Sequence, residues 1–163
     1  MSMHSATPEP WDRPLREFPG LVHLAPPVSH LDDSLTRVIE TFARDSGAGG
    51  VFVVDADDRL LGCIREHTLD FDLVTLVLPQ RLWSSVRNFE TRQVLRAARP
   101  APRRAKDLMT PTRSVTAETS LKDVLALMTR TEEPAAALVD GAGRFLGYVR
   151  RFEVLAHFVR HSN

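Results

Sequence analysis

Apolar side chains recur at positions i, i+3, i+4 and i+7 in two segments that lie far apart in the chain. The first set is Leu35, Val38, Ile39 and Phe42, and the second set is Leu121, Val124, Leu125 and Met128. This spacing predicts one short amphipathic helix in each segment. Ser34 and Ser120 directly precede the two sets, where a serine hydroxyl satisfies a free backbone N–H as an N-cap.

Two short apolar runs with a polar turn between them follow each predicted helix. Residues 51–54 and 60–64 form the first pair, and residues 135–139 and 145–149 form the second. Two β-prone runs around an Asp-rich or Gly-rich turn predict a hairpin. An extended segment precedes each helix and a further apolar stripe follows each hairpin. Each half of the chain therefore predicts the order strand, helix, strand, strand, helix.

The two predicted hairpins are also similar in sequence. VVDADDRLLGCIR, which begins at Val53, aligns without a gap with LVDGAGRFLGYVR, which begins at Leu138. One such unit is too small to bury much apolar surface by itself. The repeat therefore predicts an α/β (α+β) fold in which two β-α-β-β-α repeats pack sheet to sheet with pseudo-two-fold symmetry.

These patterns divide the chain into four segments. We expect a flexible, proline-rich N-terminal leader at residues 1–20 and the first repeat at residues 21–78. A basic, helical linker follows at residues 79–106, and the second repeat occupies residues 107–163.

The overall charge is balanced, because 21 basic residues match 21 acidic ones. A balanced chain gives no global reason to expect nucleic acid or an acidic membrane as a partner. Arg92, Arg96 and Arg99 form a basic stripe in the linker, which we interpret as a solvated helix face because the aromatic spacing of a single-strand binder is missing. No apolar run approaches the roughly 20 residues of a membrane span, and the single cysteine excludes an intrachain disulfide. We expect a cytoplasmic protein.

The second copy opens with DLMTP, continues through SVTAETSL and a Val-Asp turn, and has a glycine that leads into its last strand. These features resemble a cystathionine-β-synthase (CBS) domain, and the first copy resembles it mainly through GVFVVDADDRLLG. The resemblance implies a tandem CBS pair, called a Bateman module. Such a module is regulatory rather than catalytic, pairs into a homodimer, and controls a separate enzyme or transporter.

The resemblance also implies a regulatory ligand, most plausibly AMP, ADP or ATP, and no required cofactor. In nucleotide-binding members a hydroxyl after the glycine-led strand contacts phosphate, and a carboxylate three residues later accepts from ribose. Here those positions are Arg150 and Glu153 in the second copy and Arg65 and Thr68 in the first. An arginine fork suits phosphate. Alternatively, both arginines pair with neighbouring carboxylates, and the chain is a dimeric interaction scaffold whose degenerate clefts bind no nucleotide.

The remaining candidate contacts of the second cleft follow from the same resemblance. Val115 and Thr116 are expected to line one side of the ligand. Pro134, Ala135 and Ala136 are expected to offer backbone groups and small side chains to its base.

The sequence gives only weak signals for a metal site, a phosphate-binding loop or a reactive thiol. His157 and His161 lie at i and i+4 on the last predicted helix but lack an evident third metal ligand. The aspartates of residues 55–58 fit a hairpin turn better than a cation site. Residues 47–50, GAGG, lack the Lys-Ser/Thr of a phosphate-binding loop, and Cys63 is expected to be buried and inert.

A dimer is predicted from the last helix of each repeat, residues 69–78 and 153–160. These helices carry more apolar side chains than one sheet can cover, and contiguous apolar surface usually marks a contact. The expected surplus is Phe71, Leu73, Val77, Phe158 and Val159.

Overall fold

The computed structural model describes residues 9–69 and 103–161. In chain order its strands and α-helices are β1 (Val22–His23), β2 (Val28–His30), α1 (Leu35–Arg44), β3 (Gly50–Val54), β4 (Leu60–Arg65), α5 (Ala105–Leu108), β5 (Ser114–Val115), α6 (Leu121–Arg130), β6 (Ala135–Val139), β7 (Phe145–Arg150) and α7 (Arg151–His161). Short 3-10 helices lie at η1 (Pro10–Asp12), η2 (Leu15–Glu17), η3 (Pro19–Leu21) and η4 (Ser46–Ala48). The basic stripe and most of the helix predicted at 69–78 lie outside the described residues.

The strands form two sheets, one for each repeat. The first has the order β2-β3-β4, and the second has the order β1-β7-β6-β5. In both sheets a hairpin pairs antiparallel, and the strand that precedes the helix pairs parallel to the first hairpin strand. The predicted order of strand, helix, strand and strand is confirmed in both repeats, and the predicted last helix is confirmed in the second repeat. The fourth strand, β1, was not predicted, and it joins the second sheet although it lies at the start of the first repeat.

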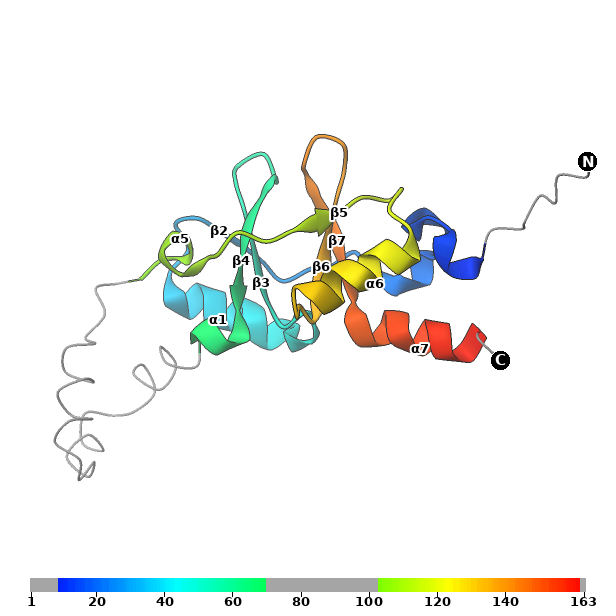
Figure 1. The fold of residues 1–163 in the computed structure, drawn as a ribbon. Coiled ribbons are helices and arrows are strands. Elements are labelled where there is room, and N and C mark those ends of the chain that lie inside the picture. The colour runs from blue at the N-terminus through cyan, green and yellow to red at the C-terminus, as the bar shows by residue number, and fades with distance from the viewer. Residues whose placement is uncertain (1–8, 70–102, 162–163) are drawn as a thin grey trace, which may run out of the picture.

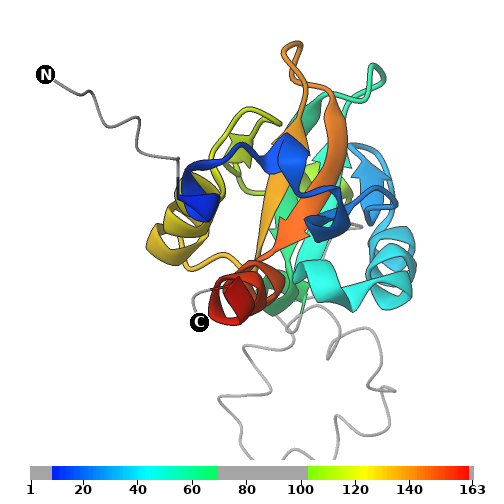
Figure 2. The ribbon, with the colours of Figure 1, turned by 90° about the vertical axis from the view of Figure 1, so that its right-hand side faces the viewer.

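The two predicted helices begin where the N-cap serines are. The Ser34 hydroxyl accepts a hydrogen bond from the Arg37 backbone N–H at 3.3 Å, and the Ser120 hydroxyl accepts from the Asp123 N–H at 3.1 Å. The apolar stripe of each helix packs on the outer face of its own sheet. Figure 1 shows α1 on one side of the two central hairpins and α6 and α7 on the other. Figure 2 gives the same arrangement from the side.

The inner faces of the two sheets pack on each other. This central core contains Phe52 and Cys63 from the first repeat and Ala137 and Tyr148 from the second, all of them buried. The Phe52 ring lies 5.8 Å from the Tyr148 ring, centroid to centroid. Each repeat therefore supplies apolar surface that the other repeat covers, and the predicted sheet-to-sheet packing is confirmed.

The hairpin turns follow the same design in both repeats. The Asp55 carboxylate accepts from the backbone N–H groups of Asp57 and Arg59, both at 2.9 Å. The Asp140 carboxylate accepts in the same way from the backbone N–H groups of Ala142 and Arg144 in its own turn, at 2.8 and 2.9 Å. The aspartates at 55 and 140 thus satisfy turn backbone groups, which agrees with the prediction of a turn rather than a cation site. Residue 58 and Gly143 have positive φ in these turns.

The N-terminal leader requires a correction. We expected residues 1–20 to be flexible, but the described part of this segment, residues 9–20, packs on the second repeat. Leu15 is buried in the core of that repeat, and its N–H donates to Thr119 O at 2.8 Å. The Trp11 ring stacks on Phe158 at 5.6 Å. The prolines of this segment begin tight turns instead of keeping it extended, so its apolar side chains reach the core.

The segment that leads into the second repeat packs on the first repeat, the converse of the N-terminal segment. Ala105 and Leu108 of α5 are buried in the core of the first repeat. Thr110 then pairs with Cys63 of β4 through two backbone hydrogen bonds, of 2.9 and 3.0 Å. Residues 107–110, which we assigned to the second repeat, therefore pack on the first repeat. We call residues 9–23 and 105–110 the exchanged arms, because each packs on the repeat that it does not lead into.

Candidate ligand-binding site

The two repeat-equivalent arginines lie at the junction between the repeats. Arg65 ends β4 and is followed by a helical turn, and Arg150 ends β7 immediately before α7. Each guanidinium reaches a carboxylate of the other repeat, Glu133 for Arg65 and Asp45 for Arg150. Arg65 and Arg150 occupy matching positions of the two repeats, and each pairs with a carboxylate of the other repeat. The two carboxylates, Glu133 and Asp45, do not occupy matching positions.

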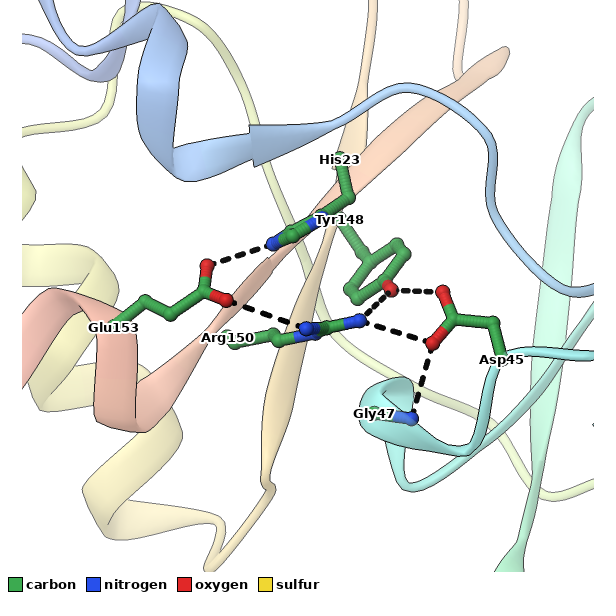
Figure 3. A network of polar contacts seen from close by, with 6 residues as sticks. All are labelled: His23, Asp45, Gly47, Tyr148, Arg150 and Glu153. Atoms are coloured by element: carbon green, nitrogen blue, oxygen red, sulfur yellow. Dashed lines mark hydrogen bonds and ion pairs between the residues drawn. The ribbon is translucent and has the colours of Figure 1, made fainter.

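Arg150 is the centre of a group of polar side chains that we call the Arg150 cluster (Figure 3). Its members are His23, Asp45, Tyr148, Arg150 and Glu153. The Nη2 of Arg150 donates to Asp45 Oδ1 and to the Tyr148 hydroxyl, both at 2.9 Å. Its Nη1 donates to Glu153 Oε1 at 3.3 Å, and its carbon Cζ lies 5.6 Å from the Tyr148 ring centroid.

The cluster is closed on both sides by residues from the first half of the chain. His23, on β1, contacts Glu153 Oε2 through Nε2 at 2.7 Å and stacks on the Tyr148 ring at 4.9 Å. Asp45 directly follows α1, and its Oδ1 also accepts from the Gly47 N–H at 3.0 Å. Both carboxylates of the cluster are thus already hydrogen-bonded within the protein.

The charges in the cluster follow from these contacts. Burial and the hydrogen bond to Asp45 raise the pKa of Tyr148 to about 12. Tyr148 is therefore protonated at neutral pH, and its hydroxyl donates to Asp45. Burial raises the pKa of Asp45, but the hydrogen bonds from Tyr148 and Gly47 and the charge of Arg150 outweigh it, so the net shift is downward. Asp45 is an anion in the folded protein at neutral pH.

Arg65 makes a simpler contact. Its guanidinium forms a two-pronged pair with Glu133, and its Nη1 lies 3.4 Å from the Thr110 hydroxyl of an exchanged arm. The hydrogen bond to Glu133 is the largest of the influences that raise the pKa of Arg65. A paired fork of this kind holds the two repeats together at a second point.

A cavity of about 670 Å³ opens beside Arg65, between the repeats. It is lined by Ser46, Gly47, Gly49, Arg65, Glu66, His67, Thr131, Glu132, Glu133 and Pro134. Its volume falls in the range of about 300–1,000 Å³ that is usual for small-molecule sites. Gly47, in the wall of the cavity, lies directly against Arg150, since a Cβ on Gly47 would lie 2.4 Å from Arg150 Nη2.

The structure brings together some of the predicted site residues but not all. Arg65 and Pro134 line the cavity, whereas Arg150 and Glu153 belong to the Arg150 cluster and are not among the lining residues. Thr68 is in the helical turn after β4. The others are placed as follows: the Val115 and Ala136 side chains are in the core under α6 and α7, Ala135 is in the core between the sheets, and Thr116 is in an exposed turn.

Three members of the cluster were missed by the sequence analysis. Tyr148 carried one signal in the sequence, because it is a residue with a polar hydroxyl in an otherwise apolar predicted strand. It aligns with Cys63 of the first repeat. Asp45 and His23 carried no local signal, because neither lies in a repeated motif. Asp45 is 105 positions from Arg150, and His23 is 130 positions from Glu153, so only the folded chain joins them.

Two further candidates from the sequence, the histidine pair and Cys63, lie away from the Arg150 cluster or are buried. His157 and His161 stack at 4.2 Å, and the Nδ1 of His161 bonds to the His157 backbone oxygen. Across residues 9–69 and 103–161, no group of three or more His, Cys, Asp or Glu side chains is arranged to hold a metal. Cys63 is buried, and burial together with the nearby charge of Glu133 raises the pKa of its thiol to about 12. No helix in the same ranges is long and apolar enough to cross a membrane.

Comparison with known proteins shows which domain and which solved structures this chain is similar to. Residues 105–160 match the family model of the CBS domain. A CBS domain-containing protein from Thermotoga maritima aligns over 91% of this chain and 96% of its own, with a TM-score of 0.66 and 20% identity. CBSX2 in complex with AMP aligns over 93% of this chain and 99% of its own, with a TM-score of 0.67 and 21% identity.

A third structure, the cytosolic domain of the Mg²⁺ channel MgtE in complex with ATP, aligns over 85% of this chain and 47% of that chain. Its TM-score is 0.60 at 20% identity. The comparison with curated proteins gave no match. Residues 105–160 are thus similar to a CBS domain, and the chain as a whole has the fold of the solved tandem CBS-domain pairs.

Proposed function

We propose that this chain is a regulatory module that senses an adenine nucleotide between its two repeats and passes a change of shape to a separate enzyme or transporter. The observation that carries the proposal is the cavity of about 670 Å³ at the junction, with Arg65 in its wall and Arg150 behind Gly47. Two structures of the same fold, CBSX2 and the MgtE cytosolic domain, are complexes with AMP and with ATP.

The ligand contacts that we propose follow from the chemistry of these residues. Arg150 meets a phosphate, because its planar fork pairs with oxyanions. Glu153 accepts hydrogen bonds from ribose hydroxyls. Pro134 and Ala135 offer backbone groups to the base, and the Pro134 O already accepts from the Arg151 N–H at 2.8 Å at this edge. Val115 and Ala136 take part only through the packing behind the site, because their side chains are buried.

A second function is supported by the same contacts. Both arginines pair with carboxylates of the opposite repeat, as a scaffold with degenerate clefts would require. In that case the arginines join the repeats and no nucleotide binds. The module would then act only as an interaction surface.

Titration calorimetry with AMP, ADP and ATP separates the two functions. A charge-assisted hydrogen bond is worth roughly 1.5–3 kcal/mol, so Arg150→Ala is expected to weaken binding about ten- to a hundredfold. Arg65→Ala is expected to have a smaller effect, since Thr68 stands where a ribose-binding carboxylate would be needed. Absence of heat and of any rise in melting temperature with the parent protein at millimolar ligand would leave the scaffold function.

We also propose that the module is a homodimer that uses α7. Phe152, Leu155 and Val159 lie at i, i+3 and i+7 on this helix, and their exposed fractions are 72%, 36% and 69%. Phe158, which we expected in the surplus, instead packs on the core and on Trp11. An exposed apolar stripe of this kind on a helix usually marks a contact surface.

A further inference from the structure

The Asp45 carboxylate occupies a set of donors that is suited to a ligand anion. Arg150 Nη2, the Tyr148 hydroxyl and the Gly47 backbone N–H all point to it. Figure 3 shows the three donors converging on the two oxygens of this one side chain. A guanidinium, a hydroxyl and a main-chain N–H are the groups with which proteins hold phosphates and carboxylates. The protein thus fills its own anion site with a side chain.

Charge limits what can enter this site while Asp45 remains in place. Arg150 contributes one positive charge, and Asp45 and Glu153 contribute two negative ones. A phosphate would add further negative charge and meet repulsion from both carboxylates. A phosphate can bind Arg150 strongly only if one carboxylate leaves, and Glu153 is the one that the proposed ribose contact retains. Asp45 is therefore the carboxylate to be displaced.

Displacement of Asp45 would act on the loop that carries it. Asp45 begins the segment that continues through η4 to Gly49, and this segment forms one wall of the cavity. Gly49 has a left-handed φ of 69° and lies against Pro134 of the second repeat, where a Cβ would be 2.2 Å from the proline Cγ. A change at Asp45 is thus mechanically connected to the contact between the two repeats.

We propose that Asp45 is an internal competitor for the anionic group of the ligand at Arg150, and that ligand binding releases residues 45–49 from the second repeat. This inference rests on the proposed function. It assigns to Asp45 a regulatory role: its carboxylate sets the ligand concentration at which the module responds, because a site that is closed part of the time binds with a proportionally lower affinity.

The test is calorimetric titration of AMP into the parent protein, Asp45→Asn and Asp32→Asn. Asparagine keeps the shape of Asp45 and its acceptor for the Gly47 N–H but removes the charge. Asp45→Asn is expected to bind AMP about tenfold more tightly than the parent, the scale of one charge-assisted hydrogen bond. Asp32→Asn is the matched control, because it makes the same charge change at an exposed pair with Lys106.

A second variant protects the test against misfolding. Asp45→Ser removes the carboxylate but leaves the Arg150 guanidinium, the Tyr148 hydroxyl and the Gly47 N–H in place, so it is expected to tighten AMP binding in the same direction as Asp45→Asn. Thermal melts of all variants establish that they are folded. If Asp45→Asn does not fold, an unchanged or weaker affinity in Asp45→Ser overturns the inference.

The outcomes distinguish the inference from the function on which it rests. Binding by the parent with equal or weaker binding by Asp45→Asn overturns the inference and leaves the proposed function standing. An equal gain in Asp32→Asn also overturns it, because the effect would then be one of net charge. Binding by Asp45→Asn alone supports the inference in its strongest form. If no folded variant binds AMP, the proposed function fails and the inference fails with it.

Discussion

Two glycines at equivalent positions of the repeat, Gly62 and Gly147, have a role that can be stated atom by atom. A Cβ on Gly62 would lie 2.5 Å from the Thr110 carbonyl oxygen, and a Cβ on Gly147 would lie 2.4 Å from the His23 carbonyl oxygen. Thr110 and His23 belong to the two exchanged arms. The glycines are therefore required where an arm crosses the last strand of the opposite repeat, and any side chain would push the arm away.

The corresponding prediction concerns stability. Gly62→Ala and Gly147→Ala are each expected to lower the free energy of unfolding by about 1–3 kcal/mol, since the obstacle is backbone and must shift. Gly141→Ala is the control, because no atom lies within 4 Å of its Cβ position. Urea unfolding of the three variants measures the difference. A Gly147→Ala protein as stable as Gly141→Ala would contradict the assignment.

At this scale the sequence predicted half of the candidate site. Arg65, Arg150 and Glu153 were found because the repeat aligns the residues after each glycine. Asp45 and His23 could not be found in the same way, because their role depends on which segment lies opposite Arg150 and Glu153. An aspartate that follows a helix has many ordinary uses, and only tertiary contact gives this one its partners.

At the scale of elements, the local sequence pattern predicted which helices and strands form, but not which repeat each of them packs on. The hairpins, the two N-capped helices and the strand that precedes each helix are all present. Periodicity shows which face of a helix or strand is apolar, but it carries no information on which repeat covers that face. The prediction that the N-terminal leader is flexible was wrong for this reason. Its prolines suggested a flexible segment, whereas Leu15 and Trp11 fill surface of the second repeat.

The N-terminal arm is therefore expected to contribute to the free energy of unfolding. Leu15 is 1% exposed and lies in the core of the second repeat, so Leu15→Ala is expected to cost about 2–5 kcal/mol of unfolding free energy. Leu24→Ala is the control, since Leu24 is 76% exposed and its truncation should change stability by less than about 0.5 kcal/mol. Thermal or urea unfolding provides the comparison. Equal effects of the two substitutions would show that the arm is not part of the core.

At the scale of the whole molecule, the exposed stripe on α7 predicts the assembly. The parent protein is expected to have the mass of two chains at micromolar concentration by light scattering. Phe152→Asp should give the mass of one chain, because a charge in the middle of an apolar interface cannot be solvated. Leu24→Asp serves as the control, since it places the same charge on an exposed leucine outside α7.

A parent protein with the mass of a single chain would refute the dimer. A dimer that persists in Phe152→Asp would show that the dimer interface lies on a surface other than the exposed stripe of α7. In either case the calorimetric predictions for Arg150 and Asp45 stand, because every residue of the Arg150 cluster comes from one chain.

The exchanged arms also bear on how such a chain could arise. Residues 9–23 pack on the second repeat, and residues 105–110 pack on the first, at positions related by the repeat. Two separate copies of a single repeat would make the same contacts by trading arms between subunits, as in a domain-swapped dimer. Duplication and fusion of the gene for such a subunit would preserve every contact while freeing the halves to diverge. The unlike carboxylates opposite Arg65 and Arg150 are the kind of divergence that fusion permits and that a symmetric ancestor could not have held.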